Sequence, residues 1–316
     1  MIKHKVAIIG LGDIARKAYL PVVTAMDNVE VTGIMSRREE TVRQIGSQYR
    51  LAPCCTELGS LLRTEPEAVF IHTATESHYS LAMECLSQGL HVYVDKPLSY
   101  DLKESEAMTE AADKYGRLLA VGFNRRFAPR YRDAKEWLSS AGGMQLAVAQ
   151  KHRTRLQSHD AAKTIYDDLI HMLDLLLWLG EGSQLQTPEL PADIRLDGDG
   201  RLLHVSGMVQ LNGVSGLYSM NRSAGADLEK LELHGSGRSA EVTNLEEAWL
   251  YSKGEGKRQL SFGSWDSVLF RRGFTGAVEH FLTALDRPDL CEIRADRVLA
   301  THRLADALVK KITATP

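Results

Sequence analysis

Continuous runs of apolar residues recur along the first part of the chain. They are VAIIG at 6–10, VEVTGIM at 29–35, AVFIHT at 68–73, HVYVD at 91–95 and LLAVGF at 118–123. Runs that do not alternate with polar residues predict strands buried on both faces of a parallel sheet. Amphipathic segments at 39–49, 77–88 and 102–115 separate them and predict crossover helices. Residues 1–122 are therefore expected to form a doubly wound α/β domain.

The pattern changes after residue 122. Strand-like segments now follow one another closely and are separated by turn sequences such as DGDG and LNGV, which is typical of an antiparallel sheet. The expected strands are 146–153, 201–211, 215–222, 228–235 and 247–253, and the expected helices are 165–179, 276–285 and 295–311. Residues 123–316 are therefore predicted to be an α+β domain with a large, mostly antiparallel open sheet, which binds substrate and forms oligomers.

Composition narrows the possible partners. The 316-residue chain is 44% hydrophobic and 25% charged, with 38 Lys and Arg against 41 Asp and Glu and a net charge of −3. This near-neutral chain has no broad electrostatic footprint for nucleic acid or an anionic membrane, and no long basic tract supplies a local one. A small-molecule partner is therefore expected.

Cysteine usage and the start of the chain bear on location. The four cysteines lack C-x-x-C spacing in a chain large enough to fold without disulfides, which predicts reduced thiols without a metal role for Cys54, Cys55, Cys85 and Cys291. The start leads directly into a strand without a secretory h-region, and no apolar run approaches the ~20 residues of a membrane span. A cytoplasmic protein with no metal site is the expectation.

A glycine motif follows the first strand at once. In GLGDIA, Gly10 and Gly12 allow a tight turn and a close approach of backbone N–H groups to a pyrophosphate at a helix N-terminus. Ala15 takes the third position of the G-x-G-x-x-G/A pattern and permits helix–strand packing. Because the motif stands in a strand–turn–helix context with four further strands behind it, a dinucleotide-binding Rossmann domain is favoured over a merely structural turn.

The end of the second strand bears on the choice of cofactor. An NAD enzyme usually carries an acid there for the adenine ribose, but this chain has Ser36, Arg37 and Arg38. A hydroxyl followed by arginine fits a 2′-phosphate, which guanidinium binds by charge-assisted hydrogen bonds. NADP(H) is therefore favoured over NAD(H), and the alternative is that both arginines are simply solvated.

Lys96 interrupts an apolar strand at its end, in VYVDKPLS. Strand ends at the carboxyl edge of a parallel sheet point into the ligand crevice. An ammonium there could hydrogen-bond a substrate hydroxyl and oppose its negative charge as a proton leaves. Pro97 can hold the turn in an unusual shape, since X-Pro bonds adopt cis at small cost. The alternative is a lysine that snorkels to solvent.

A second set of candidate groups lies on the expected helix 165–179. Asp167, His171 and Asp174 fall at i, i+4 and i+7, which makes one polar stripe on an otherwise apolar helix. A histidine can accept the proton of an alcohol, and a carboxylate one turn away can orient it. As alternatives, Thr164 and Asp167 could form a capping pair, and Asp174 could be a satisfied core acid, which is the preferred interpretation of Asp174.

These motifs together resemble a known family. GLGDIA, HTATESH, GLHVYVDKPLS, VGFNRRFAP and the D-x-x-x-H-x-x-D helix occur in the same order in the glucose-fructose oxidoreductase, inositol dehydrogenase and rhizopine-catabolism (Gfo/Idh/MocA) oxidoreductases. The chain looks closest to the MviM branch, the virulence-factor-like oxidoreductases, which share K-H-R at 151–153 and H-D at 159–160. The resemblance runs over nearly the whole chain.

The resemblance implies roles for individual residues. Lys96 and His171 are implied to be catalytic, with Asp167 as the partner acid. The residues expected along the cofactor are Gly10, Leu11, Gly12, Asp13, Ile14, Ser36, Arg37, Thr73, Ala74, Thr75, His78, Asp95, Lys96 and Asn124. The residues expected to bind substrate are Lys96, Arg125, Arg153, His159, Asp167 and His171.

The chain also departs from the family pattern. Asp95 stands where the family usually has Glu, Ala74 where many members have proline, and AAKTIYD where a glycine-rich stretch commonly precedes the helix. Asp168 is a rival for the partner acid. On a regular helix of ~3.6 residues per turn it lies about 100° from the His171 face, so Asp168→Asn is expected to leave kcat nearly unchanged.

Basic residues gather between the two expected domains, at Arg125, Arg126, Lys151, His152, Arg153, Arg155 and His159. On one strand Lys151, Arg153 and Arg155 share a face, and His152 points to the other. They could bind an anionic substrate such as a sugar acid or sugar phosphate, or they could form ion pairs with the abundant acids.

The leading hypothesis is an NAD(P)-dependent oxidoreductase that moves a hydride between nicotinamide and a carbinol or carbonyl carbon. From the family, the substrate is expected to be a sugar, a polyol or a derivative. The alternatives are a non-catalytic NAD(P)-binding sensor and a cofactor-assisted glycoside hydrolase on the same fold. A large sheet with an apolar open face further predicts a homodimer or homotetramer.

Overall fold

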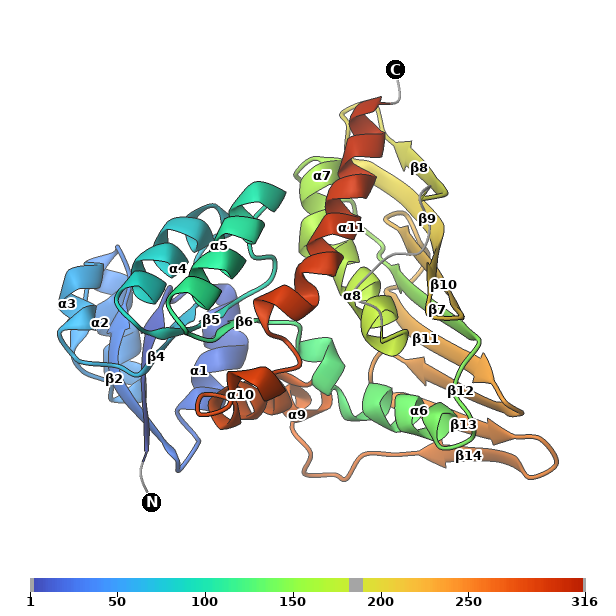
Figure 1. The fold of residues 1–316 in the computed structure, drawn as a ribbon, viewed down its shortest axis with the longest axis horizontal. Helices are drawn as coiled ribbons and strands as arrows, with labels where there is room; N and C mark the ends of the chain where they lie inside the picture. The colour runs from blue at the N-terminus through green and yellow to red at the C-terminus, as the bar shows by residue number, and fades with distance from the viewer. Residues whose placement is uncertain (1–2, 182–189, 315–316) are drawn as a thin grey trace. The chain divides into compact units, whose positions relative to one another are not determined.

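The computed structural model of the protein describes residues 3–181 and 190–314. The chain divides into two compact units (Figure 1). Unit 1 comprises Met1–Phe123 and Phe274–Leu299, and unit 2 comprises Asn124–Gly273 and Ala300–Pro316. The first division lies within one residue of the boundary that the sequence predicts. No helix among the described residues is long and apolar enough to cross a membrane.

Residues 274–299 differ from the sequence-based division, because they belong to unit 1 rather than to the second domain. The reason is aromatic packing. The Phe274 ring meets the Tyr19 ring edge-on at 5.5 Å, and the Phe281 ring meets those of Phe70 and Tyr93 at 5.3 and 5.4 Å. These rings lie far apart in the sequence, so no local pattern indicates the contact.

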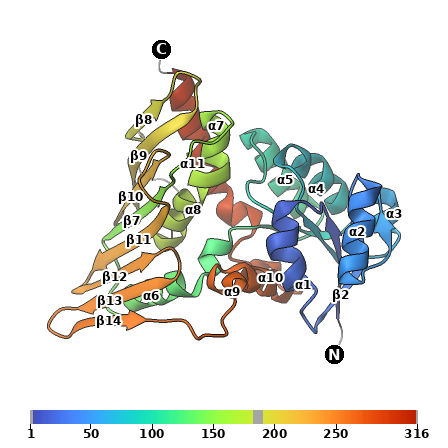
Figure 2. The same ribbon diagram turned by 180° about the vertical axis from the view of Figure 1, so that it is seen from behind.

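Unit 1 contains a six-stranded sheet with the order β3-β2-β1-β4-β5-β6, and every pair is parallel. Figure 2 shows its strand β2 in blue. The strands are β1 (His4–Ile9), β2 (Val29–Met35), β3 (Cys54–Cys55), β4 (Ala68–Ile71), β5 (His91–Val94) and β6 (Leu119–Val121). All residues of β4, β5 and β6 are buried, as expected for strands covered on both faces. The predicted doubly wound fold is confirmed.

The helices of unit 1 follow the amphipathic segments. In α2 the buried side chains are Val42 and Ile45, and acidic residues fill the first turn, where the helix dipole favours them. The helical segments are η1 (Ala15–Tyr19), α1 (Leu20–Val23), α2 (Glu39–Tyr49), α3 (Leu58–Leu62), η2 (Thr75–Ser77), α4 (His78–Ser87), α5 (Leu102–Lys114), α10 (Phe274–Thr283), η5 (Pro288–Leu290) and the start of α11 (Ala295–Ala314).

Unit 2 contains an eight-stranded sheet with the order β14-β13-β12-β11-β7-β10-β9-β8. Its strands are β7 (Leu146–His152), β8 (Ala192–Leu196), β9 (Leu202–Leu211), β10 (Val214–Asn221), β11 (Leu228–Gly235), β12 (Arg238–Thr243), β13 (Glu247–Ser252) and β14 (Gly256–Leu260). The predicted large sheet is confirmed, and it is antiparallel except where β7 and β10 pair in parallel.

Helices cover one face of this sheet. The helix α8 packs on β7 and β10, and α6 packs on β11, β12 and β13 (Figure 1). The helical segments are η3 (Asn124–Phe127), α6 (Pro129–Ser139), α7 (Ala161–Thr164), η4 (Ile165–Leu169), α8 (Ile170–Leu179), α9 (Val268–Arg271) and the rest of α11. Every residue of α8 is buried, which explains its apolar sequence.

Candidate active site

The glycine turn after β1 has the geometry of a cradle. Gly10 has a φ of +88°, and a Cβ there would lie 2.6 Å from the Thr73 backbone nitrogen, so only glycine fits. A Cβ on Gly12 would meet nothing within 4 Å, so open space faces its backbone. The helix begins directly after it, with the Arg16 N–H donating to the Gly12 carbonyl at 3.1 Å. A pyrophosphate fits this turn, because it needs close backbone approach at a helix start.

This turn lies at the place where the sheet order reverses. In open α/β sheets, ligands bind outside the carboxyl ends of the strands at that switch point, which here is the end of β1 and β4. The residues predicted to line the cofactor in unit 1 all follow the carboxyl ends of β1, β2, β4 or β5. One of them, Asp13, forms an exposed ion pair with Lys17 at 2.8 Å.

The end of β2 carries the predicted phosphate contacts. The Ser36 hydroxyl oxygen accepts a hydrogen bond from the Arg38 N–H at 3.4 Å, and the Ser36 N–H donates to the Cys55 carbonyl at 3.1 Å. The Arg37 side chain is exposed and forms no ion pair within residues 3–181 and 190–314. It can therefore turn to a ligand phosphate.

Lys96 immediately follows β5 and is half-buried, and the Lys96–Pro97 peptide bond is cis. Beside it, the Asp95 carboxylate accepts a hydrogen bond from the Tyr19 hydroxyl at 3.2 Å, and that hydroxyl also lies 3.2 Å from the Tyr93 hydroxyl. Burial raises the pKa of Asp95, and the neighbouring Lys96 charge opposes that rise. A carboxylate and two tyrosines thus lie at the strand end that carries the lysine.

Two histidines lie next to this strand end. His78 is buried, with its Nδ1 2.9 Å from the Pro97 carbonyl and its Nε2 3.2 Å from the Thr73 carbonyl, so it links the turns after β4 and β5. These two contacts fix the position of the His78 ring between the two turns, and its place along the cofactor stays a prediction. His72, which the sequence analysis missed, stacks on the Tyr19 ring at 3.9 Å, and burial lowers its pKa to about 3.

In unit 2, the expected regular helix is interrupted. The segment η4 is a π turn, in which backbone hydrogen bonds run from i to i+5, and the α-helix resumes only at Ile170. The expectation that Asp168 lies about 100° from the His171 face assumed 3.6 residues per turn, and it is wrong for this segment. Asp168 is buried and forms ion pairs with Lys151 and Arg222. The Asp167 carboxylate instead lies 3.6 Å from the His159 Nε2.

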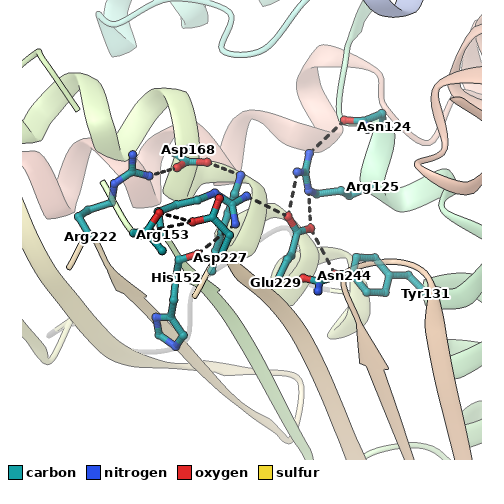
Figure 3. Close-up of polar contacts among 12 residues, drawn as sticks. Asn124, Arg125, Tyr131, His152, Arg153, Asp168, Arg222, Asp227, Glu229 and Asn244 are labelled. Carbon is teal, nitrogen blue, oxygen red and sulfur yellow. Dashed lines mark hydrogen bonds and ion pairs between the residues drawn. The ribbon is translucent and has the colours of Figure 1, made fainter. Parts of the chain in front are cut away.

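The Asp168 ion pairs belong to a larger buried set of charges (Figure 3). The Glu229 carboxylate accepts two hydrogen bonds from Arg125, at 2.6 and 2.9 Å, and one from the Tyr131 hydroxyl at 3.3 Å. Arg153 lies farther away, 3.9 Å from Glu229. Burial alone would raise the pKa values of both acids, but the surrounding cations lower them, that of Glu229 to about 2.

The ion-pair alternative therefore holds for Arg125 and Lys151, since buried carboxylates already engage both side chains. Lys151 is buried and its neighbour His152 is half-exposed, as expected for opposite faces of a strand, but β7 ends at His152, so Arg153 and Arg155 lie beyond the strand. The Asn124 side chain, expected at the cofactor, donates to the Arg272 carbonyl at 2.8 Å and accepts from Arg125 at 3.4 Å.

Asp174 and His171 occupy the same buried helix. Asp174 forms two hydrogen bonds with Arg126, at 2.8 and 2.6 Å, and accepts another from the Thr301 hydroxyl at 3.1 Å. These contacts support the interpretation of Asp174 as a satisfied core acid. His171 is buried, with 6% of its surface exposed.

Known proteins match both parts of the chain. Residues 4–123 match the model of the oxidoreductase family with an NAD-binding Rossmann fold, and residues 129–252 match that of the YceM-like C-terminal domain. A Salmonella typhimurium protein named as an oxidoreductase, YceM, is 32% identical over 306 residues, which are 96% of each chain. The chain belongs to the Gfo/Idh/MocA family of oxidoreductases.

Other members are similar over the full length. The dehydrogenase MviM of Clostridium difficile is 30% identical, with a TM-score of 0.89 over 98% of this chain and 99% of that one. The UDP-N-acetylglucosamine 3-dehydrogenase of Acidithiobacillus ferrooxidans is 26% identical over 317 residues, 95% of each chain. The predicted family and the MviM-like branch are thus confirmed, and the chain is an oxidoreductase.

The cofactor of Gfo/Idh/MocA enzymes is a nicotinamide dinucleotide, and the turn at Gly10 and Gly12 fits its pyrophosphate. The described residues contain no cluster of three or more His, Cys, Asp or Glu side chains that could hold a metal ion. The sequence analysis missed the roles of Glu229 and Arg222. The sequence gives little indication of these roles, since Glu229 and Arg222 are each a single charged residue at the end of a strand and their partners lie on other strands or helices.

Proposed function

We propose that this Gfo/Idh/MocA oxidoreductase interconverts an alcohol and a ketone on a sugar, a polyol or a derivative. The observation that carries the proposal is the position of Lys96 at the carboxyl end of β5, in a sheet whose switch point holds the glycine cradle. The full-length similarity to a dehydrogenase of a nucleotide sugar supports the substrate class. Nicotinamide, when bound, accepts or donates the hydride.

The chain's own residues manage the proton. In the oxidation direction, the Lys96 ammonium hydrogen-bonds the substrate hydroxyl oxygen and stabilises its developing negative charge. His171 accepts the hydroxyl proton as general base, and Asp167 orients the imidazole. The reverse reduction returns the same proton to the carbonyl oxygen. Asp168 is not proposed for this role, because its carboxylate is committed to Lys151 and Arg222.

We further propose that NADP(H) is preferred to NAD(H). Arg37 is exposed at the end of β2, with Ser36 beside it and no acid to bind a ribose diol. A guanidinium matches the geometry and charge of a 2′-phosphate.

We also propose a homodimer or homotetramer that forms through the open face of the sheet of unit 2. Leu217 and Met208 are direct cross-strand neighbours on that face and are 37% and 36% exposed. Exposed apolar patches on a sheet face are characteristic of protein interfaces.

A screen of sugars, polyols and sugar acids with both cofactors, read at the nicotinamide absorbance band, tests the activity. Steady formation of NADPH with an alcohol substrate supports a dehydrogenase. Substrate cleavage without net NADPH production would indicate the glycoside hydrolase alternative. If cofactor binds but no substrate turns over, and Lys96→Met and His171→Asn leave every property unchanged, the sensor alternative replaces this proposal.

A further inference from the structure

A pocket of about 400 Å³ lies within unit 2. Its lining residues are Arg153, Thr154, Arg155, Arg222 and Asp227. Three of these five residues carry a guanidinium group and one carries a carboxylate. No role in the proposed proton transfer explains this concentration of arginine.

The parallel pairing of β7 and β10 creates the pocket. Because the two strands run in the same direction, their carboxyl ends meet at one edge of the sheet, where His152 pairs with Asn221. Arg153 and Arg222 are the next residues of each strand, and the Arg153 N–H donates to the Asn221 carbonyl at 2.8 Å. Asp227 comes just before β11, which pairs with β7 on its other side. An antiparallel pair would have put the two arginines at opposite edges.

Positive charge exceeds negative charge around this pocket. Five cations against three carboxylates leave a net charge of +2 among the residues that line the pocket or belong to its ion pairs. The cations are Arg125, Lys151, Arg153, Arg155 and Arg222, and the carboxylates are Asp168, Asp227 and Glu229. Burial, together with the charge of Arg125, lowers the pKa of Lys151 to about 8. At that pKa Lys151 is still mainly protonated at neutral pH, so it counts among the cations.

The three arginines differ in how many of their guanidinium N–H groups already bond to acceptors within the protein. Arg222 donates to Asp168 and to the Arg155 carbonyl, so it contributes mainly charge. Arg153 uses one donor on the His152 carbonyl at 3.0 Å, and its contact to Glu229 is longer than a hydrogen bond. The Arg155 guanidinium is exposed and has no ion pair in the part of the chain that the structure describes.

The one acid in the lining is already occupied. Asp227 accepts hydrogen bonds from the Thr154 N–H at 2.8 Å and from the Thr154 hydroxyl at 3.0 Å. Those two bonds, with the charges of Arg153 and Arg222, lower the pKa of Asp227, so it remains ionised near neutral pH. Arg153 and Arg155 therefore retain donors for a further acceptor, and the net charge favours an anionic one.

We propose that this pocket binds an anionic oxygen group, a carboxylate or a phosphate, of the small-molecule substrate. The inference rests on the proposed function and narrows its substrate class to acidic sugars, such as sugar acids and sugar phosphates. Guanidinium groups bind both oxyanions through paired N–H donors. Within unit 2, Arg222 connects the pocket to Asp168 of η4, and η4 leads directly into α8, where His171 lies three residues after Asp168. An anion held here is thus linked, through one ion pair, to the turn that precedes the proposed base.

Isothermal titration of the full-length protein, with saturating NADPH and at constant ionic strength, tests the pocket. The probes are gluconate for a carboxylate, glucose 6-phosphate for a phosphate, and glucose as the neutral counterpart. We expect at least one charged probe to bind saturably and at least about tenfold more tightly than glucose. The charged probe that binds identifies the anion.

Arg155→Gln is the decisive variant, because it removes an exposed charge without breaking an ion pair and so leaves folding intact. It should lower the affinity for the charged probe by about tenfold or more, since a charge-assisted hydrogen bond is lost. The matched control is Arg195→Gln, an exposed arginine of unit 2 that pairs with Asp193, and it should bind as the parent protein does. Equal affinity in Arg155→Gln and the parent, or no saturation by either charged probe below about 10 mM, overturns the proposal.

Steady-state turnover of Lys96→Met, measured beside the titration of Arg155→Gln, separates this inference from the proposed function. If probe binding depends on Arg155 while Lys96→Met leaves turnover unchanged, the pocket is correct and the catalytic assignment is wrong. If Lys96→Met abolishes turnover while Arg155→Gln binds the probes normally, the catalytic assignment is correct and the pocket is wrong.

Discussion

Asp168→Asn should destabilise unit 2, because it removes the carboxylate that neutralises two buried cations. The exposed fractions of the three side chains are 13% for Asp168, 4% for Lys151 and 5% for Arg222. Removing one partner of a buried ion pair typically costs about 3–5 kcal/mol, since the remaining charge is left without compensation. Asparagine keeps the shape and one acceptor, so we expect the lower end, about 3 kcal/mol. With an m-value on the order of 3 kcal/mol/M, the urea midpoint should fall by roughly 1 M.

Tryptophan fluorescence isolates this effect. The chain has four tryptophans, and Trp137, Trp178, Trp249 and Trp265 all lie in unit 2, so urea unfolding followed by their emission reports that unit. The matched control is Asp193→Asn, the same chemical change in an exposed ion pair with Arg195 of unit 2, which should leave the midpoint almost unchanged. Lys151→Met combined with Asp168→Asn should recover part of the loss, because it removes one of the stranded charges.

A midpoint for Asp168→Asn indistinguishable from that of the parent protein would refute this reasoning. So would strictly additive effects in the double variant, because residues that share an ion pair should be coupled by about 0.5–3 kcal/mol.

Four further predictions concern catalysis, cofactor choice, pH and assembly. Lys96→Met and His171→Asn should each lower kcat by roughly 10²-fold or more, while the affinity for NADP(H) stays within a few-fold. Asp167→Asn should lower kcat less. Steady-state kinetics and cofactor titration check this, with Lys103→Met, at an exposed lysine, as the control. Arg37→Ala should remove most of the preference for NADP(H), worth about 1.5–3 kcal/mol, whereas Arg43→Ala, whose arginine pairs with Glu39, should not; equal affinities for both cofactors in the parent protein would contradict the assignment. The pKa values of Asp168 and Glu229 are lower in the folded than in the unfolded protein. The two carboxylates therefore stabilise the fold fully above their unfolded pKa values of ~4, and this stabilisation is lost as the pH falls toward about 2. Acid unfolding detected by tryptophan fluorescence should depend less steeply on pH in Asp168→Asn than in the parent protein. Leu217→Arg should dissociate the proposed oligomer by placing a charge in the apolar contact, and light scattering that finds a monomeric parent protein at micromolar concentration would exclude the oligomer.

Strong local patterns identified most elements of the fold. The predicted bounds of β2, α2 and β11 coincide with the observed ones, because each has a clear period and marked ends. The strand β3, at Cys54–Cys55, has only two residues and therefore no period to detect. The helix α6, at Pro129–Ser139, was missed because its sequence is mostly polar, and its buried residues are only Tyr131, Ala134 and Leu138.

The candidate site was predictable only where chemistry follows local sequence. The glycine cradle and Lys96 could be placed because each follows a recognisable strand in a parallel sheet. The environment of Asp168 could not be predicted, for two reasons. The π turn shifts the helical phase without any change in hydrophobic pattern, and the partners Lys151 and Arg222 come from strands whose parallel pairing no local signal encodes.

The central position of β7 also affects how unit 2 folds. This strand pairs with β10 on one side and β11 on the other, and its hydrogen-bonded neighbours His152 and Asn221 are 69 residues apart in the chain. Contacts of such long range form slowly, because the closure entropy of the intervening chain must be overcome before the pairing stabilises it. We therefore expect the β7 amides to be among the last in unit 2 to exchange with deuterium, since opening them requires both halves of the sheet to separate.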